Sequence, residues 1–87
     1  MIVYEFIFVV MREIKKLSSL EVGERGIIRS FEDSDLLIKL LEMGCVPGEI
    51  VKVEQRAPLG DPISIHVSGY SLSLRITEAD QILVERI

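Results

Sequence analysis

The chain has 87 residues, of which 48% are hydrophobic, a formal net charge of −4 and a single cysteine. This length predicts one domain, and the apolar share excludes an intrinsically disordered chain. The ten basic residues are scattered among fourteen acidic ones, so the sequence offers no basic face for nucleic acid. One cysteine cannot form an intramolecular disulfide, which favours a reducing compartment and therefore the cytoplasm.

The first predicted element is an apolar run at residues 2–11, IVYEFIFVVM. It is shorter than the ~20 apolar residues that span a bilayer, and it lacks the basic region and cleavage site of a signal peptide. Its β-branched and aromatic residues favour a strand. Three interpretations stay open: a strand added to this domain or to a neighbouring copy in a homo-oligomer, an artefact of the chosen start site, or contact with a membrane surface. We therefore expect an N-terminal extension and polar junction at 1–16 and one domain at 17–87.

An apolar clip is predicted next, with Leu17, Leu20 and Val22 on the core, a turn at Gly23 and a strand at 26–31.

A helix is predicted at 35–43, with Ser34 as its N-cap and Gly44 as the left-handed residue that ends it. Asp35, Lys39 and Glu42 form its polar stripe. The apolar residues cover most of the remaining circumference, which indicates either deep burial or an additional contact.

Strands are predicted at 50–56, 63–67, 70–76 and 82–87, with a short helical turn capped by Thr77 at 77–80. Apolar residues alternate along the first three of these strands, as in a half-buried sheet. With the strand at 26–31 the chain has five short strands joined by tight turns. This pattern predicts a mainly β fold: a small closed barrel of the SH3-like type with one α-helix and a helical turn.

The first two of these strands are joined by RAPLGDP at 56–62. Both prolines fix their own φ and favour an extended residue before them, and Gly60 can adopt a positive φ without steric cost. The tip of this hairpin should therefore be rigid. Leu59 on the tip either forms a contact point at the surface or folds back over the end of the barrel.

No catalytic group of residues is apparent. Cys45 has no second sulfur near it and follows a helix end, which predicts a small buried hydrophobe. His66 falls on the outer face of its strand, and no Cys/His pair has the spacing of metal ligands. No glycine-rich phosphate loop opens a helix. The sequence therefore indicates a binding module without catalysis, cofactor or metal site.

Three segments together resemble the family of ferrous iron transport protein A, FeoA. They are LEMGCVPG at 41–48, RAPLGDPI at 56–63 and GYSLSLR at 69–75, followed by EA at 78–79. The resemblance covers about 17–87, and residues 1–10 lie outside it.

This resemblance implies an accessory role beside the membrane ferrous-iron permease FeoB, whose cytoplasmic part is a GTP-binding domain. It implies partner contacts at Arg56, Pro58, Leu59, Gly60 and Asp61 of the tip, and at Leu40 and Met43 of the helix as a second place. Two alternatives stay open. One is a regulatory module like the SH3-like C-terminal domain of iron-dependent repressors, and the other is a direct carrier of ferrous iron.

Overall fold

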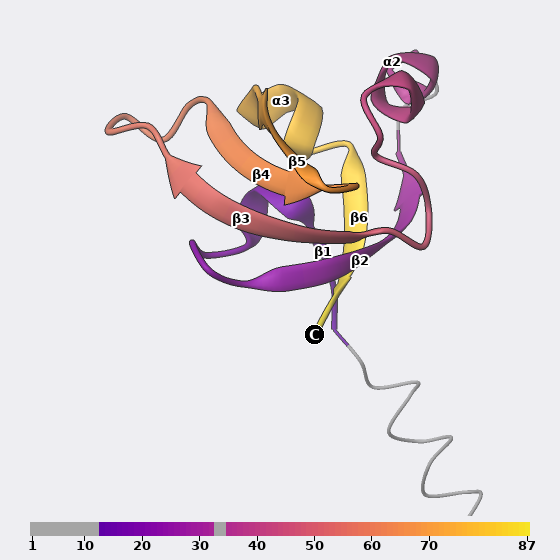
Figure 1. Cartoon of the computed structure of the whole chain (residues 1–87), viewed down its shortest axis with the longest axis horizontal. Coiled ribbons are helices and arrows are strands. Elements are labelled where there is room, and N and C mark those ends of the chain that lie inside the picture. The colour runs from indigo at the N-terminus through magenta and orange to yellow at the C-terminus, as the bar shows by residue number, and fades with distance from the viewer. Residues whose placement is uncertain (1–12, 33–34) are drawn as a thin grey trace, which may run out of the picture.

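The computed structural model of the chain describes residues 13–32 and 35–87 (Figure 1). The apolar run at 2–11 and the predicted cap Ser34 lie outside the described residues. Within these two ranges, no helix is long and apolar enough to span a bilayer. The elements are β1 (Ile14–Lys16), the 3₁₀-helix η1 (Leu17–Ser19), β2 (Arg25–Phe31), α2 (Leu37–Glu42), β3 (Ile50–Arg56), β4 (Ile63–Val67), β5 (Tyr70–Leu74), α3 (Ile76–Ala79) and β6 (Ile82–Arg86).

All the described strands join one antiparallel sheet in the order β1-β6-β2-β3-β4-β5. The mainly β class and the SH3-like arrangement are as predicted, but the sheet has six described strands and two edges, β1 and β5, so it is curled rather than closed. The additional strand is β1, in a segment expected to be a polar junction. Its three residues pair with β6, from Ile14 opposite Glu85 to Lys16 opposite Leu83. β1 has only three residues, too few for an alternating sequence pattern to predict a strand. It forms because the edge of β6 is available for pairing.

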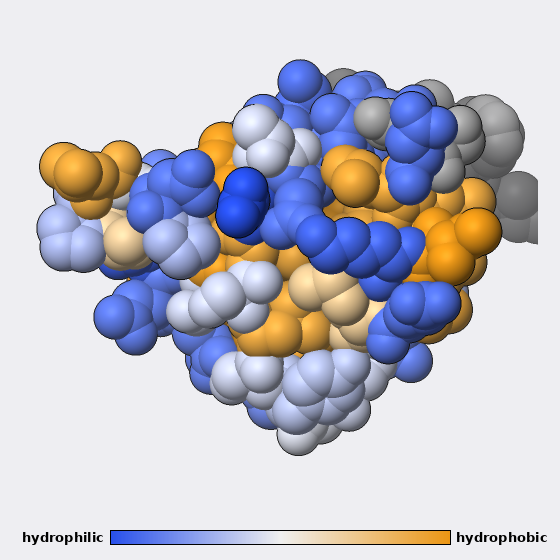
Figure 2. Space-filling model, turned by 90° about the horizontal axis from the view of Figure 1, so that it is seen from above, coloured by the Kyte–Doolittle hydropathy of each residue, from blue (hydrophilic) through white to orange (hydrophobic). Residues whose placement is uncertain are grey.

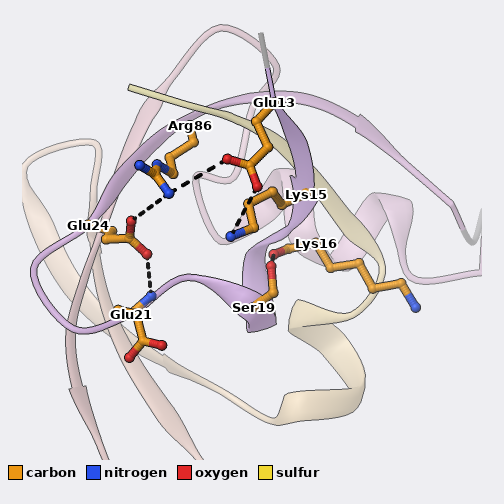
Figure 3. Close-up of polar contacts among 7 residues, drawn as sticks. All are labelled: Glu13, Lys15, Lys16, Ser19, Glu21, Glu24 and Arg86. Carbon is orange, nitrogen blue, oxygen red and sulfur yellow. Dashed lines mark hydrogen bonds and ion pairs between the residues drawn. The ribbon is translucent and has the colours of Figure 1, made fainter. Parts of the chain in front are cut away.

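Ion pairs hold β1 and the C-terminal strand together (Figure 3). Arg86 lies between two carboxylates, 3.6 Å from Glu13 and 3.3 Å from Glu24. The other Glu24 oxygen accepts a 2.7 Å hydrogen bond from the Glu21 backbone N–H. Exposed pairs of this kind contribute little each, but this network joins both ends of the described fold to the turn before β2.

The core lies on the inner face of the curled sheet. β3 and β4 supply alternate buried residues to it, as their sequence patterns predict. Leu17 and Leu20 of the apolar clip are fully buried, but Val22 is 56% exposed, so its predicted place in the core is wrong. The reason is the turn: Gly23 donates a backbone hydrogen bond to Val53, and this leaves Val22 facing solvent. The completely buried apolar residues are Leu17, Leu20, Ile28, Leu40, Cys45, Val51, Val53, Ile63, Ile65, Val67, Leu74, Ala79, Ile82 and Val84.

The helices differ in detail from the predictions. α2 is shorter than the expected span of 35–43. α3 begins after Arg75, so Thr77 is not its cap. The Glu78 carboxylate instead accepts a 2.9 Å hydrogen bond from the Arg75 backbone N–H, three residues before it. This is half of a capping box and satisfies an N–H at the start of the helix.

Candidate functional site

The β3–β4 tip projects from the body of the molecule (Figures 1 and 2). Two backbone hydrogen bonds close it, from Ala57 N–H to Pro62 and from Gly60 N–H to Ala57. Gly60 has φ +90°, the conformation predicted for it. Leu59 is 97% exposed, which rules out the alternative in which it folds back over the barrel end. The tip therefore holds one apolar side chain in solvent on an ordered backbone.

Two of the predicted tip residues serve the fold itself. The Arg56 guanidinium donates hydrogen bonds of 2.6 Å to the carbonyls of Ser18 and Leu20, and so ties the end of β3 to the apolar clip. Asp61 accepts a 3.0 Å hydrogen bond from the Ile76 backbone N–H at the start of α3. These contacts fix the direction in which the tip points, and they leave Pro58 and Leu59 as its outward-facing apolar residues.

In the structure, the two residues predicted as contacts on α2 face the core. Leu40 is fully buried and Met43 is half-buried against the core. Leu40 therefore cannot meet a partner while α2 stays in place. The apolar residues of α2 that do face solvent are Ile38 and Leu41. A wide apolar arc in the sequence does not show which side of the helix is covered.

Polar contacts along α2 and at its C-terminal end determine which face of the helix packs on the rest of the protein. Lys39 Nζ lies 2.6 Å from the carboxylate of Glu78 on α3. At the other end, the Tyr70 hydroxyl donates a hydrogen bond to the Met43 carbonyl, and the Ser68 hydroxyl donates one of 3.1 Å to the Gly44 carbonyl. Ser68 in the turn between β4 and β5, and Tyr70 at the start of β5, thus satisfy carbonyls that have no partner within the helix.

Glu78 is an acidic residue whose carboxylate accepts hydrogen bonds from both Lys39 and the Arg75 backbone. Its side chain is nearly buried, and it borders a pocket beside the tip lined by Asp61, Pro62, Ser73, Leu74 and Arg75. The hydrogen bond from Lys39, followed by that from the Arg75 backbone, lowers the pKa of Glu78 below its ordinary value of 4.5. It is thus a paired carboxylate, with a structural role between α2 and α3.

Cys45 is fully buried, as predicted. Burial, with a smaller contribution from the charge of Glu78, raises the pKa of its thiol to about 11. A thiol of this kind is not ionised near neutral pH and is a poor nucleophile. His66 is exposed on the outer face of β4, also as predicted. Across residues 13–32 and 35–87, no three His, Cys, Asp or Glu side chains come together as a metal site would require.

The profile of the FeoA domain matches residues 15–86. A curated relative from Porphyromonas gingivalis, an Fe(2+) transport protein A/Fe(2+) transporter FeoB fusion protein, is 40% identical over 73 residues. The match covers 83% of this chain but only 9% of that relative, so the chain corresponds to a small part of the fusion protein.

Two solved structures extend the likeness to the fold. An FeoA-like protein from Clostridium acetobutylicum is 37% identical with a TM-score of 0.82, over 88% of this chain and 91% of that one. The FeoA of Stenotrophomonas maltophilia, solved with zinc and described as a prokaryotic SH3 domain protein, is 29% identical with a TM-score of 0.72, over 82% and 89%. A manganese-dependent transcriptional repressor matches with a TM-score of 0.78 at 18% identity, over 88% of this chain and 44% of the repressor; this likeness concerns the fold alone.

Proposed function

The chain belongs to the FeoA domain family, and from this premise we propose that it is a small cytoplasmic accessory protein of ferrous iron uptake. We infer that it acts by protein–protein contact with the FeoB permease and its GTP-binding domain, without catalysis of its own.

One observation carries this proposal. In the P. gingivalis relative, transport protein A and the transporter FeoB form a single chain. Fusion keeps two domains at a high effective concentration, which favours contact between them. A separate chain with the same domain would have to make that contact through its own surface.

The β3–β4 tip is the surface that we assign to this contact. Leu59 is 97% exposed, and the backbone that carries it is held by hydrogen bonds on both sides of the loop. An apolar group on an ordered loop loses little conformational entropy when it binds. Pro58 and Leu59 would touch the partner, and Arg56, Gly60 and Asp61 would hold the tip in position.

Calorimetric titration of the full chain against the purified GTP-binding domain of the permease tests the proposal. The titration is run with GDP and then with a GTP analogue. We expect saturable binding that differs between the two nucleotides. Absence of binding to this domain and also to the full-length permease would refute the proposed function.

The same titration with Leu59→Asp tests the tip. A charge in an apolar contact is expected to weaken binding at least tenfold, which corresponds to about 1.4 kcal/mol. Because Leu59 is in solvent, the melting temperature should stay unchanged. Val22→Asp, at another exposed apolar position, is the matched control and should bind normally. A large drop in the melting temperature of Leu59→Asp would show that the tip belongs to the core.

A further inference from the structure

The outer face of the sheet, on the side away from the core, carries a row of basic side chains. Arg25 of β2 lies directly opposite Lys52 of β3, and Lys52 lies directly opposite His66 of β4. All three residues are exposed. Residues directly opposite on antiparallel strands project from the same face, with their side chains next to each other. We call Arg25, Lys52 and His66 the basic row.

The basic row is unfavourable for the isolated fold. Like charges directly opposite on neighbouring strands destabilise a sheet. Among the residues described at 13–32 and 35–87, neither Arg25 nor Lys52 has an ion-pair partner. By contrast, Arg29 on the same face lies 3.0 Å from the Glu85 carboxylate. An anion bound beside Arg25 and Lys52 would offset their repulsion.

A row of apolar side chains runs next to the basic row. Ile27 of β2 lies directly opposite Ile50 of β3. This pair is two residues along from Arg25 and Lys52, a distance of about 7 Å, and therefore projects from the same face. The row continues across β6 to Ile14 of β1. Ile14 is 53% exposed, Ile50 is 49% exposed and Ile27 is half-buried. We call Ile14, Ile27 and Ile50 the isoleucine row.

The outer face is positively charged, although the whole chain has a net charge of −4. Strand register and side-chain contacts place on it the basic residues Lys16, Arg25, Arg29 and Lys52 and the acidic residues Glu54 and Glu85. Both acids are already engaged. Glu85 is nearly buried under Arg29, and Glu54 accepts a 2.6 Å hydrogen bond from the Ser71 hydroxyl. The free charge of this face is therefore basic.

The sequence that precedes β1 points to a bilayer as the occupant of the outer face. A second copy of the chain is disfavoured, because two positive faces would bring like charges together. The apolar run at 2–11 joins the domain next to Ile14, at one end of the isoleucine row. The run is too short to span a bilayer, and such a length suits a segment that lies at the interface. Apolar burial combined with attraction to anionic lipid is how interfacial segments bind membranes.

We propose that the outer face of the sheet docks on an anionic membrane surface. The basic row faces the lipid phosphates, the isoleucine row enters the edge of the headgroup region, and the run at 2–11 inserts beside Ile14. The choice of an anionic surface rests on the proposed function, which places the chain beside the cytoplasmic leaflet, where anionic lipids create a negative potential. Docking would also raise the concentration of the protein around a membrane partner.

Co-sedimentation of the full chain with lipid vesicles tests the proposal without the permease. One set of vesicles contains equal parts of phosphatidylcholine and phosphatidylserine, and the other contains phosphatidylcholine alone. We expect the chain to bind the anionic vesicles at least tenfold more tightly, and less tightly as the salt concentration rises. Equal binding to both sets, or binding to neither, would overturn the proposal.

Variants of the basic row locate the binding. Arg25→Gln combined with Lys52→Gln should weaken binding to anionic vesicles at least tenfold. The melting temperature should not fall, because this double variant removes a repulsion. Ile38→Asp combined with Thr77→Asp is the matched control. It changes the net charge by the same amount at exposed positions on α2 and α3, which pack on the core side of the sheet, and should bind like the wild type. Equal losses in both double variants would overturn the proposal.

Two further variants test the apolar part of the contact. Ile50→Ser should weaken binding about fivefold, since its side chain is already half-buried, whereas Ile38→Ser should leave binding unchanged. Deletion of residues 1–10 should weaken binding at least tenfold and keep the preference for anionic vesicles, because the basic row remains. Unchanged affinity in folded Ile50→Ser and in the deletion variant would overturn the proposal.

Other occupants of the face give different results. Tighter binding to a polyglutamate peptide than to anionic vesicles would assign the face to an acidic protein and overturn the proposal. Self-association of the free chain that Ile50→Ser abolishes would assign it to a second copy, with the same consequence. The vesicles contain no permease, so failure of vesicle binding would leave the proposed function standing. Failure of the titration against the permease would likewise leave a positive vesicle result standing.

Discussion

At the scale of single residues, Gly44 determines how α2 ends. Its φ is +92°, a conformation that side chains other than glycine rarely adopt. A Cβ at this position would lie 2.6 Å from the Tyr70 hydroxyl, which is bound to the Met43 carbonyl. The sequence indicates the positive φ, because the glycine follows a helix. The close approach of Tyr70 appears only in the structure.

Gly44→Ala should therefore destabilise the protein more than Gly48→Ala. Gly48 also has a positive φ, of +96°, but a Cβ there would meet nothing within 4 Å. We expect about 1 kcal/mol from backbone strain at each position, and about 1 kcal/mol more at Gly44 from the displaced hydroxyl. Urea unfolding of both variants measures the difference. Equal losses would show that Tyr70 adapts without cost.

Leu40 and Leu59 show that the type of a side chain does not decide whether it is buried or exposed. Both were singled out in the sequence as contact residues, yet Leu40 is completely buried and Leu59 is 97% exposed. The residues next to each leucine in the sequence are compatible both with burial and with exposure of that leucine. Leu59 faces solvent because the tip points away from the body, and Leu40 is covered because α2 is anchored on one side by Lys39.

At the scale of elements, the pair of Lys39 and Glu78 joins α2 to α3. These are the two α-helices of the described fold, and each is short. In the sequence, Lys39 lies four residues after Asp35 in the same polar stripe. The structure places the Lys39 ammonium on a carboxylate 39 residues away in the chain. Only the fold can bring such partners together.

This pair predicts a dependence of stability on pH. The folded pKa of Glu78 lies below its ordinary value of 4.5, so the unfolded chain takes up a proton more readily than the folded one. The stabilisation is complete above pH 4.5 and is lost as the pH falls through the folded pKa. Glu78→Gln should be less stable at neutral pH and should lose less stability in acid.

Urea midpoints measured from neutral to acidic pH test this prediction. Glu49→Gln, which alters an exposed acid away from Lys39, is the control and should follow the wild type. If Glu78→Gln and the wild type lose stability in parallel, the pair does not stabilise the fold.

At the scale of the whole molecule, the two ends of the described fold lie side by side. β1 pairs with β6, and Arg86 contacts Glu13 across them (Figure 3). Among the described residues, these contacts begin at Glu13. The FeoA domain profile starts at residue 15, after the apolar run, so we expect the domain to fold without that run.

Deletion of residues 1–10 is expected to leave a folded domain with nearly the same melting temperature. If the run adds a strand to a neighbouring copy, the deletion should also reduce the oligomer to monomer. Circular dichroism during heating checks the fold, and sedimentation velocity checks the assembly. Loss of the β-sheet signal would show that the run is part of the domain's structure.

Much of this protein was predictable from the sequence alone. Alternating apolar residues predicted β3, β4 and β5 almost to their ends, because a strand that is half-buried must alternate, and the apolar run ILV at 82–84 predicted β6. Glycine and proline predicted the turns and the rigid tip, because few residues tolerate those dihedral angles. The three FeoA-like segments predicted the family.

Only the tertiary structure decided the rest. It made a strand of residues 14–16, turned Val22 and Ile38 to solvent and buried Leu40. It also made Arg56 a tie between β3 and the apolar clip. These outcomes depend on contacts between residues far apart in the chain, and a local pattern cannot show which side of an element its neighbours will cover.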